Sequence, residues 1–257
     1  MKVATWNVNS LKVRLPHVLK WLDAEQPDLL ALQETKLRDE DFPADAFSDR
    51  GYVATFSGQS AYNGVAIISR SAPTDVRHGI GNGFADEQKR VLAATFGGLR
   101  FFSLYVPNGE HPESPKYRYK LEWLAALRTL LADELTRHRN LLVVGDFNVA
   151  PDDRDVHDPR AWAGHVLCTP AERAALGTLL ELGLKDTFRL FTQPDKTFSW
   201  WDYRGAAFRR NQGLRIDLML ASAALSQTCS ACRIDKAPRG WERPSDHVPV
   251  VAELAPP

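Results

Sequence analysis

Several apolar runs of this 257-residue chain end on side chains that can bind metal ions or transfer protons. The run "LLVVGDFN" ends on Asp146 and Asn148, which are two residues apart and would point to the same side of a strand. Comparable donors lie in four other motifs: Asn7 and Asn9 in "TWNVNS", Glu34 in "LQETK", Asp217 in "GLRIDLML", and Asp246 and His247 in "SDHVPV". Open α/β sheets place their active sites at the carboxyl ends of strands, so these motifs can converge on one site.

Each motif alone also has an ordinary explanation. "GDFN" and Asn7 could form turns, Glu34 could begin a solvated loop, and Asp246 could be a cap. Asp217 is harder to explain, because a carboxylate inside an apolar strand would be buried and would need a partner. Together the donors are oxygens and one imidazole without a cysteine, a set that suits Mg²⁺ or Mn²⁺ rather than structural zinc. Phosphodiester hydrolysis needs a metal, an oriented water and a group that contacts the phosphate.

Short strands and a few helices must position these residues. Strands are expected at residues 2–8, 28–33, 52–57, 64–69, 90–96, 100–106, 141–146, 197–200, 215–220, 231–235 and 248–254, with a hairpin at Gly97-Gly98. The pattern predicts an α/β fold, a four-layer α/β sandwich of two packed mixed β-sheets flanked by helices, in one domain over residues 1–257.

Three helices are expected outside these sheets. Leucine spacing predicts a long amphipathic helix over 116–138. The capping box from Thr169 to Glu172 opens a second helix, which stops at Gly183. Apolar residues over 15–22 predict a third, with Pro16 in its first turn.

Composition limits the class of protein. The chain is 44% hydrophobic and 25% charged, as in ordinary globular proteins. No apolar stretch approaches the roughly 20 residues of a membrane span. The first strand begins at Lys2, so we expect no signal peptide and a cytoplasmic protein that acts at the nucleoid. The cysteines agree with a reducing compartment, and the lone C-x-x-C of Cys229 and Cys232 is weak evidence for a zinc or redox site.

Two basic segments stand out from a formal net charge of zero. The first, residues 204–215, contains Arg204, Arg209, Arg210 and Arg215 and no acid, and the second, residues 115–120, contains Lys116, Arg118 and Lys120. Either could be a solvated loop. Beside a phosphodiesterase site, we expect them to contact a phosphate backbone.

The order and approximate spacing of the motifs resemble the exonuclease III family of AP endonucleases, within the endonuclease/exonuclease/phosphatase superfamily. The matching motifs are "TWNVNS", "LQETK", "YNGVAI", "LYVPNG", "GDFN", "GLRIDLML" and "SDHVPV", and the resemblance covers essentially the whole chain. "GDFN" and "SDH" occur across the superfamily, whereas "LQETK", "TFSWWDYRG" and "GLRID" point to its DNA-repair branch.

The resemblance implies a role for each matching residue. Glu34 would be the principal ligand of Mg²⁺ or Mn²⁺, assisted by Asn7 and Asp246. Asp146 would position or deprotonate the attacking water. The implied metal site comprises Asn7, Glu34, Asp146, Asn148, Asp246 and His247, and the implied catalytic residues are Tyr105, Asp146, Asn148, Asp217 and His247. Among these catalytic residues, Asn148, His247 and Tyr105 would contact the phosphate, and Asp217 would orient His247.

The resemblance also implies contacts with substrate. Trp200, Leu214 and Ile216 would line an apolar pocket for an extrahelical abasic sugar, although Trp200 could instead be ordinary core. Because alternate strand residues share a face, Leu214 and Ile216 would form the pocket wall while Arg215 and Asp217 point away. A pocket too small for a base would select abasic sites. Further substrate contacts are expected from Asn108, Arg209 and Arg210.

The function implied is a metal-dependent DNA repair phosphodiesterase. It would incise 5′ to abasic sites, trim 3′ ends and degrade DNA from 3′ to 5′, acting as a monomer on double-stranded DNA with abasic sites or 3′-blocked ends, away from membranes. One alternative is a superfamily phosphatase or phospholipase, which should lack the arginine stretch and "GLRID". The other is a DNA-binding protein with little catalysis, which should have lost one of Glu34, Asp146, Asp217 and His247; all four are present.

Overall fold

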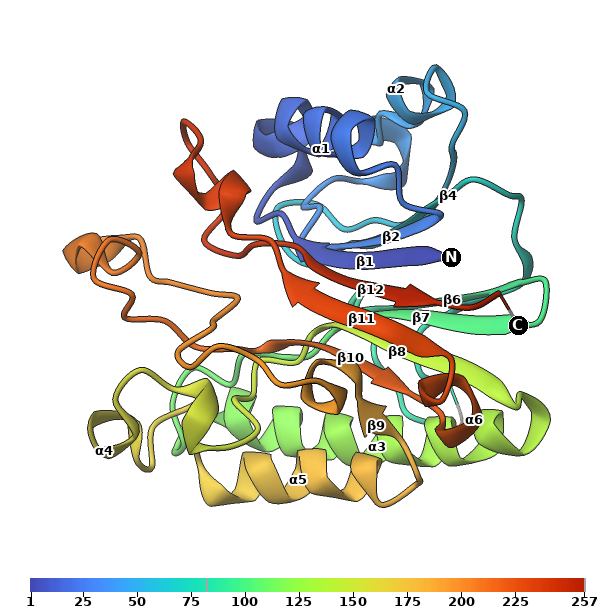
Figure 1. Cartoon of the computed structure of the whole chain (residues 1–257). Helices are drawn as coiled ribbons and strands as arrows, with labels where there is room; N and C mark the ends of the chain where they lie inside the picture. Colours follow the sequence, from blue (N-terminus) through green and yellow to red (C-terminus); the bar gives the residue numbers. More distant parts are fainter. Residues whose placement is uncertain (82, 257) are drawn as a thin grey trace.

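The computed structural model describes residues 1–81 and 83–256, which form two mixed six-stranded sheets packed face to face (Figure 1). The first sheet has the order β11-β12-β1-β2-β4-β3 and the second β5-β6-β7-β8-β10-β9. The first contains β1 (Lys2–Asn7), β2 (Leu29–Gln33), β3 (Val53–Ser57), β4 (Val65–Ser69), β11 (Cys229–Ile234) and β12 (Val250–Leu254). The second contains β5 (Thr74–His78), β6 (Val91–Phe96), β7 (Leu99–Tyr105), β8 (Asn140–Asp146), β9 (Lys185–Asp186) and β10 (Asp217–Ala221). The pairs β1–β2 and β7–β8 are parallel, and the others are antiparallel.

Helices cover the outer face of each sheet, which confirms the predicted four-layer sandwich (Figure 1). The first sheet is covered by α1 (Leu11–Glu25) and α2 (Ala44–Ser48), and the second by α3 (Pro115–Arg137) and α5 (Pro170–Leu180). The shorter elements are η1 (Asp39–Asp41), η2 (Asp153–Asp155), α4 (Pro159–Trp162), η3 (Thr187–Leu190), η4 (Arg204–Ala206), α6 (Ala223–Ser226) and η5 (Ala237–Gly240). Within the described residues, no helix is long and apolar enough to cross a membrane.

Strand β8 shows why the sheets pack in this way. Its apolar residues alternate, so Leu142 and Val144 enter the core between the sheets, whereas Leu141 and Val143 pack beneath α3 and α5. Phe147, just past the strand, joins the second of these cores. A strand that is buried on both faces holds its carboxyl end rigidly in place.

Several expectations about the elements were wrong in detail. Helix α1 begins at Leu11, so Pro16 lies in its second turn rather than its first. Residues 197–200 form no strand, because Trp200 makes only isolated bridges, and β10 begins at Asp217 rather than at residue 215. Strands β5 and β9 were not predicted: β5 is a largely exposed edge strand without an apolar alternation, and β9 has two residues. The capping box is confirmed, although α5 ends at Leu180 and a turn leads on to Gly183.

Candidate active site

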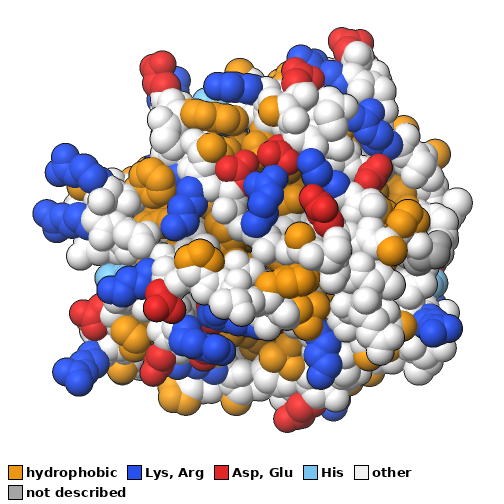
Figure 2. All heavy atoms as spheres, viewed as in Figure 1, with side chains coloured by type: hydrophobic (Ala, Val, Ile, Leu, Met, Phe, Trp, Pro, Cys, Tyr) orange, Lys and Arg blue, Asp and Glu red, His pale blue; other side chains and the backbone are white. Residues whose placement is uncertain are grey.

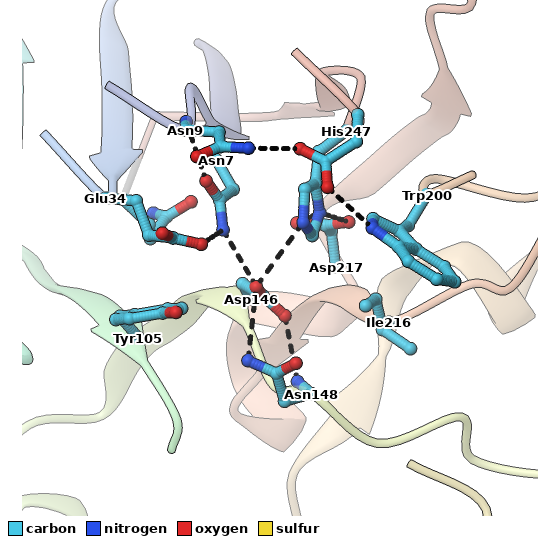
Figure 3. A network of polar contacts seen from close by, with 12 residues as sticks. Asn7, Asn9, Glu34, Tyr105, Asp146, Asn148, Trp200, Ile216, Asp217 and His247 are labelled. Atoms are coloured by element: carbon cyan, nitrogen blue, oxygen red, sulfur yellow. Dashed lines mark hydrogen bonds and ion pairs between the residues drawn. The ribbon is translucent and has the colours of Figure 1, made fainter. Parts of the chain in front are cut away.

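The predicted donors meet at one edge of the sandwich, where the parallel strands of both sheets end (Figure 3). Asn7 ends β1, and Glu34 directly follows β2 in the first sheet. In the second sheet, Asp146 ends β8 opposite Tyr105 on β7 and opposite Asp217 on β10. The site therefore joins residues from the two sheets, and the sheet packing sets the distance between them.

Gly145 explains how Asp146 reaches this position. Its φ is +147°, and a Cβ atom there would lie 1.9 Å from the carbonyl oxygen of Leu104 on the neighbouring strand. Only glycine allows so close an approach of β8 to β7. In the "GD" of the motif, Gly145 is therefore required for strand packing, and Asp146 supplies the functional carboxylate.

The side chain of Asn7 lies between two carboxylates. Its Nδ2 donates to Glu34 Oε1 and to Asp146 Oδ2, both at 2.9 Å (Figure 3). Ligand atoms of Glu34, Asp146 and His247 all lie within 4.8 Å of one another. The two converging carboxylates offer hard oxygen donors, which fit Mg²⁺ or Mn²⁺, and the Asn7 amide nitrogen holds them together. Lys36, which sequence reasoning did not single out, pairs with Glu34 at 2.8 Å.

Burial and neighbouring charges set the protonation of the two central groups. Burial raises the pKa of Asp146 to about 7, with a further contribution from the Asp217 charge, although the His247 charge and hydrogen bonds oppose it. Burial alone would lower the pKa of His247, but the charges of Asp217 and Asp146 raise it to about 10. The histidine is therefore a cation at neutral pH, and Asp146 titrates near neutrality.

Asp217 has the partner that its burial required. Its carboxylate contacts His247 Nδ1 at 2.9 and 3.1 Å, and it also accepts a 2.6 Å hydrogen bond from Ser199 Oγ. Ser199 in turn accepts from the backbone N–H groups of Ile216 and Asp217. The arrangement fixes the imidazole so that Nε2 faces the site, 3.7 Å from Asp146 Oδ2. No sequence signal identified Ser199, which lies in the segment mistaken for a strand.

Asn148 and Asn108 are hydrogen-bonded to each other next to Asp146. Asn148 has a φ of +47°, and its backbone N–H donates to Asp146 Oδ1 at 2.9 Å. Its Nδ2 donates to the carbonyl of Val106, and its Oδ1 accepts from Asn108 Nδ2 at 3.1 Å. The predicted two-residue spacing thus brings both side chains to the same place.

Tyr105 and Asp246 are two further polar residues next to the central group. Burial and the charges of Glu34 and Asp146 raise the pKa of Tyr105 well above its usual range, so its hydroxyl remains a donor. Asp246 accepts from Asn9 Nδ2 and from Trp200 Nε1, both at 3.0 Å. Asp246 therefore lies beside the close group of Glu34, Asp146 and His247 rather than within it.

The predicted pocket residues also lie together. Leu214 and Ile216 are buried in one small apolar cluster, on which Trp200 packs with part of its surface exposed. The fully buried core residues of this segment are Phe198 and the neighbouring Trp201. Trp162 on α4 was not predicted, but its ring stands perpendicular to Trp200 at 6.4 Å between centroids. An aromatic wall of two tryptophans thus borders the site.

The basic segments divide into exposed and buried residues. Arg209 and Arg210 are exposed, and within residues 1–81 and 83–256 neither forms an ion pair. Figure 2 shows basic side chains over the projecting loop that contains η4. The prediction was wrong for Arg215, which is buried against Asp155 and Asp186, and for Lys120, which is buried against Glu172. Their acidic partners lie far away in the sequence.

A hollow of about 830 Å³ adjoins the site on the side of Glu34 and Tyr105. Arg90, Asn108 and Lys116 also line it. The guanidinium of Arg90 lies over the Tyr105 ring, 4.8 Å from the ring centroid, and Arg90 Nη1 donates to the Tyr105 carbonyl. The lining also includes Asp86, Glu87 and Glu110, so cations and carboxylates face the same hollow.

The comparison with known proteins agrees with this geometry. The model of the endonuclease/exonuclease/phosphatase family matches residues 4–247. The exodeoxyribonuclease III of Haemophilus influenzae is 36% identical over 268 residues, which are 99% of this chain and 100% of that protein. A 3′ phosphatase from Neisseria, solved with a product DNA hairpin, has a TM-score of 0.97 and 47% identity over 99% of both chains. An AP endonuclease from Archaeoglobus fulgidus has a TM-score of 0.95 and 39% identity over 99% of both chains.

Proposed function

Because the chain belongs to the exonuclease III family of DNA repair nucleases, within the endonuclease/exonuclease/phosphatase superfamily, we propose that it hydrolyses the DNA backbone on the 5′ side of abasic sites. The product would carry a 3′-hydroxyl. The same site would remove 3′-blocking groups and degrade DNA from 3′ to 5′; the relatives described above are named an exodeoxyribonuclease and a 3′ phosphatase. Its substrate would be double-stranded DNA in the cytoplasm, and the active form a monomer.

The observation that carries the proposal is the convergence of Asn7, Glu34, Asp146, Asp217 and His247 on one point. Glu34 and Asp146, with Asn7 between them and Asn148 and Asp246 alongside, would hold Mg²⁺ or Mn²⁺, which when bound stabilises negative charge on the phosphate and on the leaving oxygen.

The other side chains have roles that their geometry supports. Asp146 has a pKa of about 7, so it can orient a water molecule and accept its proton near neutral pH. His247 is cationic and presents Nε2–H to a phosphate oxygen, while Asp217 holds the ring in place. Tyr105 can donate a further hydrogen bond to the phosphate, whereas both N–H groups of the Asn148 amide already donate, to Val106 and to Asp146, so Asn148 would have to exchange one of these bonds to reach it.

The test uses three duplexes: one with a single abasic analogue, one with a 3′-phosphate at a nick, and one intact with a recessed 3′ end. Each is incubated with EDTA and then with excess Mg²⁺, beside an inositol phosphate. We expect Mg²⁺-dependent cleavage on the 5′ side of the abasic analogue, and the other duplexes rank the secondary activities. Hydrolysis of the inositol phosphate alone would instead support the phosphatase alternative.

A further inference from the structure

Arg14, in the first turn of α1, joins three segments that are far apart in the sequence. Its Nη1 donates to the Asn9 carbonyl at 2.5 Å. Its Nη2 donates to the Pro244 carbonyl at 2.9 Å and to Tyr203 Oη at 3.0 Å, and its Nε to the Arg243 carbonyl at 3.2 Å. Every acceptor is uncharged, and no carboxylate of the described residues pairs with it. Such a guanidinium contributes through its geometry rather than through charge neutralisation.

The loop that Arg14 holds has a strained backbone. Asn9 and Ser10 have φ values of +43° and +90°, in a region that residues other than glycine rarely adopt. Ser10 occupies the N-cap position of α1 but makes no side-chain capping bond. The backbone N–H groups of Ser10 and Leu11 donate to the carbonyls of Glu34 and Thr35. Among the described residues, the side chain that donates to the Asn9 carbonyl is that of Arg14.

The strained loop orders the site itself. The Asn9 backbone N–H donates to Asn7 Oδ1 at 3.0 Å, which directs the Asn7 amide towards Glu34 and Asp146. The Asn9 side chain donates to Asp246 Oδ1 at 3.0 Å and accepts from Lys36 Nζ at 2.6 Å. A relaxation of Asn9 would therefore disturb both sides of the metal-binding group.

The second segment that Arg14 holds leads directly into the last catalytic residues. Residues 243 and 244 precede Ser245, whose hydroxyl donates to the Asn7 carbonyl at 2.7 Å and accepts from the His247 backbone N–H. Arg14 thus fastens the loop after β1 to the loop before β12, and through Tyr203 it also fastens the segment that carries Arg209 and Arg210.

We propose that Arg14 is a positioning residue, which locks these loops together and so sets the geometry of Asn7 and Asp246 around the metal. The inference rests on the proposed function in one respect, because it assumes that these residues surround a catalytic metal. The guanidinium is needed because its nitrogens donate to both loops at once, whereas a lysine concentrates its donors on one atom and cannot reach both.

The test compares Arg14→Met and Arg14→Lys with the control Arg50→Met. Arg50 is a matched control because its guanidinium also bridges α1 to a neighbouring segment, donating to Asp23 Oδ1 at 3.0 Å and to the Ala46 carbonyl at 3.1 Å, away from the site. For each protein we would measure kcat and KM on the abasic duplex, Mn²⁺ affinity of the DNA-free protein by calorimetric titration, and the melting temperature.

Both Arg14 variants should lose roughly 10- to 100-fold in kcat and several-fold in Mn²⁺ affinity, the size usual for groups that orient metal ligands. The KM for DNA should change less than kcat, because only the contact with Tyr203 leads to the segment of Arg209 and Arg210, and Arg14→Lys should not restore kcat. Arg50→Met should keep wild-type kcat and Mn²⁺ affinity even if its melting temperature falls as far as that of Arg14→Met.

Four results would overturn the proposal. Recovery of kcat by Arg14→Lys, or a loss confined to KM that disappears with added salt, would show a charge contact with DNA instead. Unchanged kcat and Mn²⁺ affinity in both variants would show that the lock is dispensable. A wild-type protein that cleaves no DNA refutes the proposed function alone, because the Mn²⁺ titration still decides the role of Arg14. A wild type that binds no Mn²⁺ refutes both.

Discussion

The contact between Asp217 and His247 leads to the most demanding prediction. The substitution Asp217→Asn keeps the shape of the side chain and removes its charge. A pair of unit charges 2.9 Å apart attracts by about 6 kcal/mol at an effective dielectric of about 20. Because one pH unit corresponds to about 1.4 kcal/mol, the substitution should lower the pKa of His247 from about 10 by about two to four pH units.

The measurement is an NMR titration of the imidazole nitrogens in the metal-free protein, with His247→Gln used to assign the signal. The same variant should lose roughly 10³- to 10⁴-fold in kcat, because the histidine loses both its orientation and part of its positive charge. The remaining rate should fall as pH rises through the lowered pKa, since the neutral imidazole is the inactive form.

Asp155→Asn is the matched control. Asp155 is also a buried carboxylate beside the second sheet, but it pairs with Arg215 instead of a histidine. This control should lose stability and leave the pKa of His247 near that of the wild type. If His247 in Asp217→Asn still titrated as in the wild type, the electrostatic explanation of its charge would be wrong.

The remaining predictions concern the acid, the metal and a buried lysine. Asp146→Asn should lower the incision rate roughly 10²- to 10⁴-fold and keep DNA affinity, which a binding assay in EDTA can check; near-wild-type incision would contradict its role. The pKa of Asp146 is raised from 3.8 to about 7 and that of His247 from 6.5 to about 10, so their stabilising protons are lost as pH rises. The melting temperature in EDTA should therefore fall between pH 5 and pH 9, and Mg²⁺ should raise it most at the alkaline end; the opposite trend would refute this reasoning. Lys120→Met would leave Glu172 buried without its cation, so the free energy of unfolding should fall by about 3–5 kcal/mol in urea titrations. Lys116→Met, at an exposed ion pair, should change it by less than about 0.5 kcal/mol, and equal effects would contradict the argument.

Residues at strand ends could be predicted from the sequence because a run of neighbouring apolar residues is enough to identify each strand. The apolar run before Asp146 fixes where the strand ends, and the parallel pairing of β7 with β8 then places Tyr105 beside it. The same local logic identified the helix cap at Thr169, whose side chain and that of Glu172 make both bonds of the capping box.

Residues whose role depends on distant partners could not be read in this way. Arg215 looked like part of a basic surface, but Asp155 and Asp186 bury it. Ser199 and Arg14 gave no signal, because the groups that they hold lie 18 and up to 230 residues away. Sequence patterns report secondary structure and its exposed face, whereas these contacts form only when the sheets pack together.

The position of β12 has a consequence for how the site is assembled. Among the described strands it comes last in the sequence, yet it pairs with β1 on one side and β11 on the other, in the interior of the first sheet. Asp246 and His247 directly precede β12, whereas Asn7 ends β1. The pairing of these two strands therefore brings together catalytic residues that lie about as far apart in the sequence as the described chain allows.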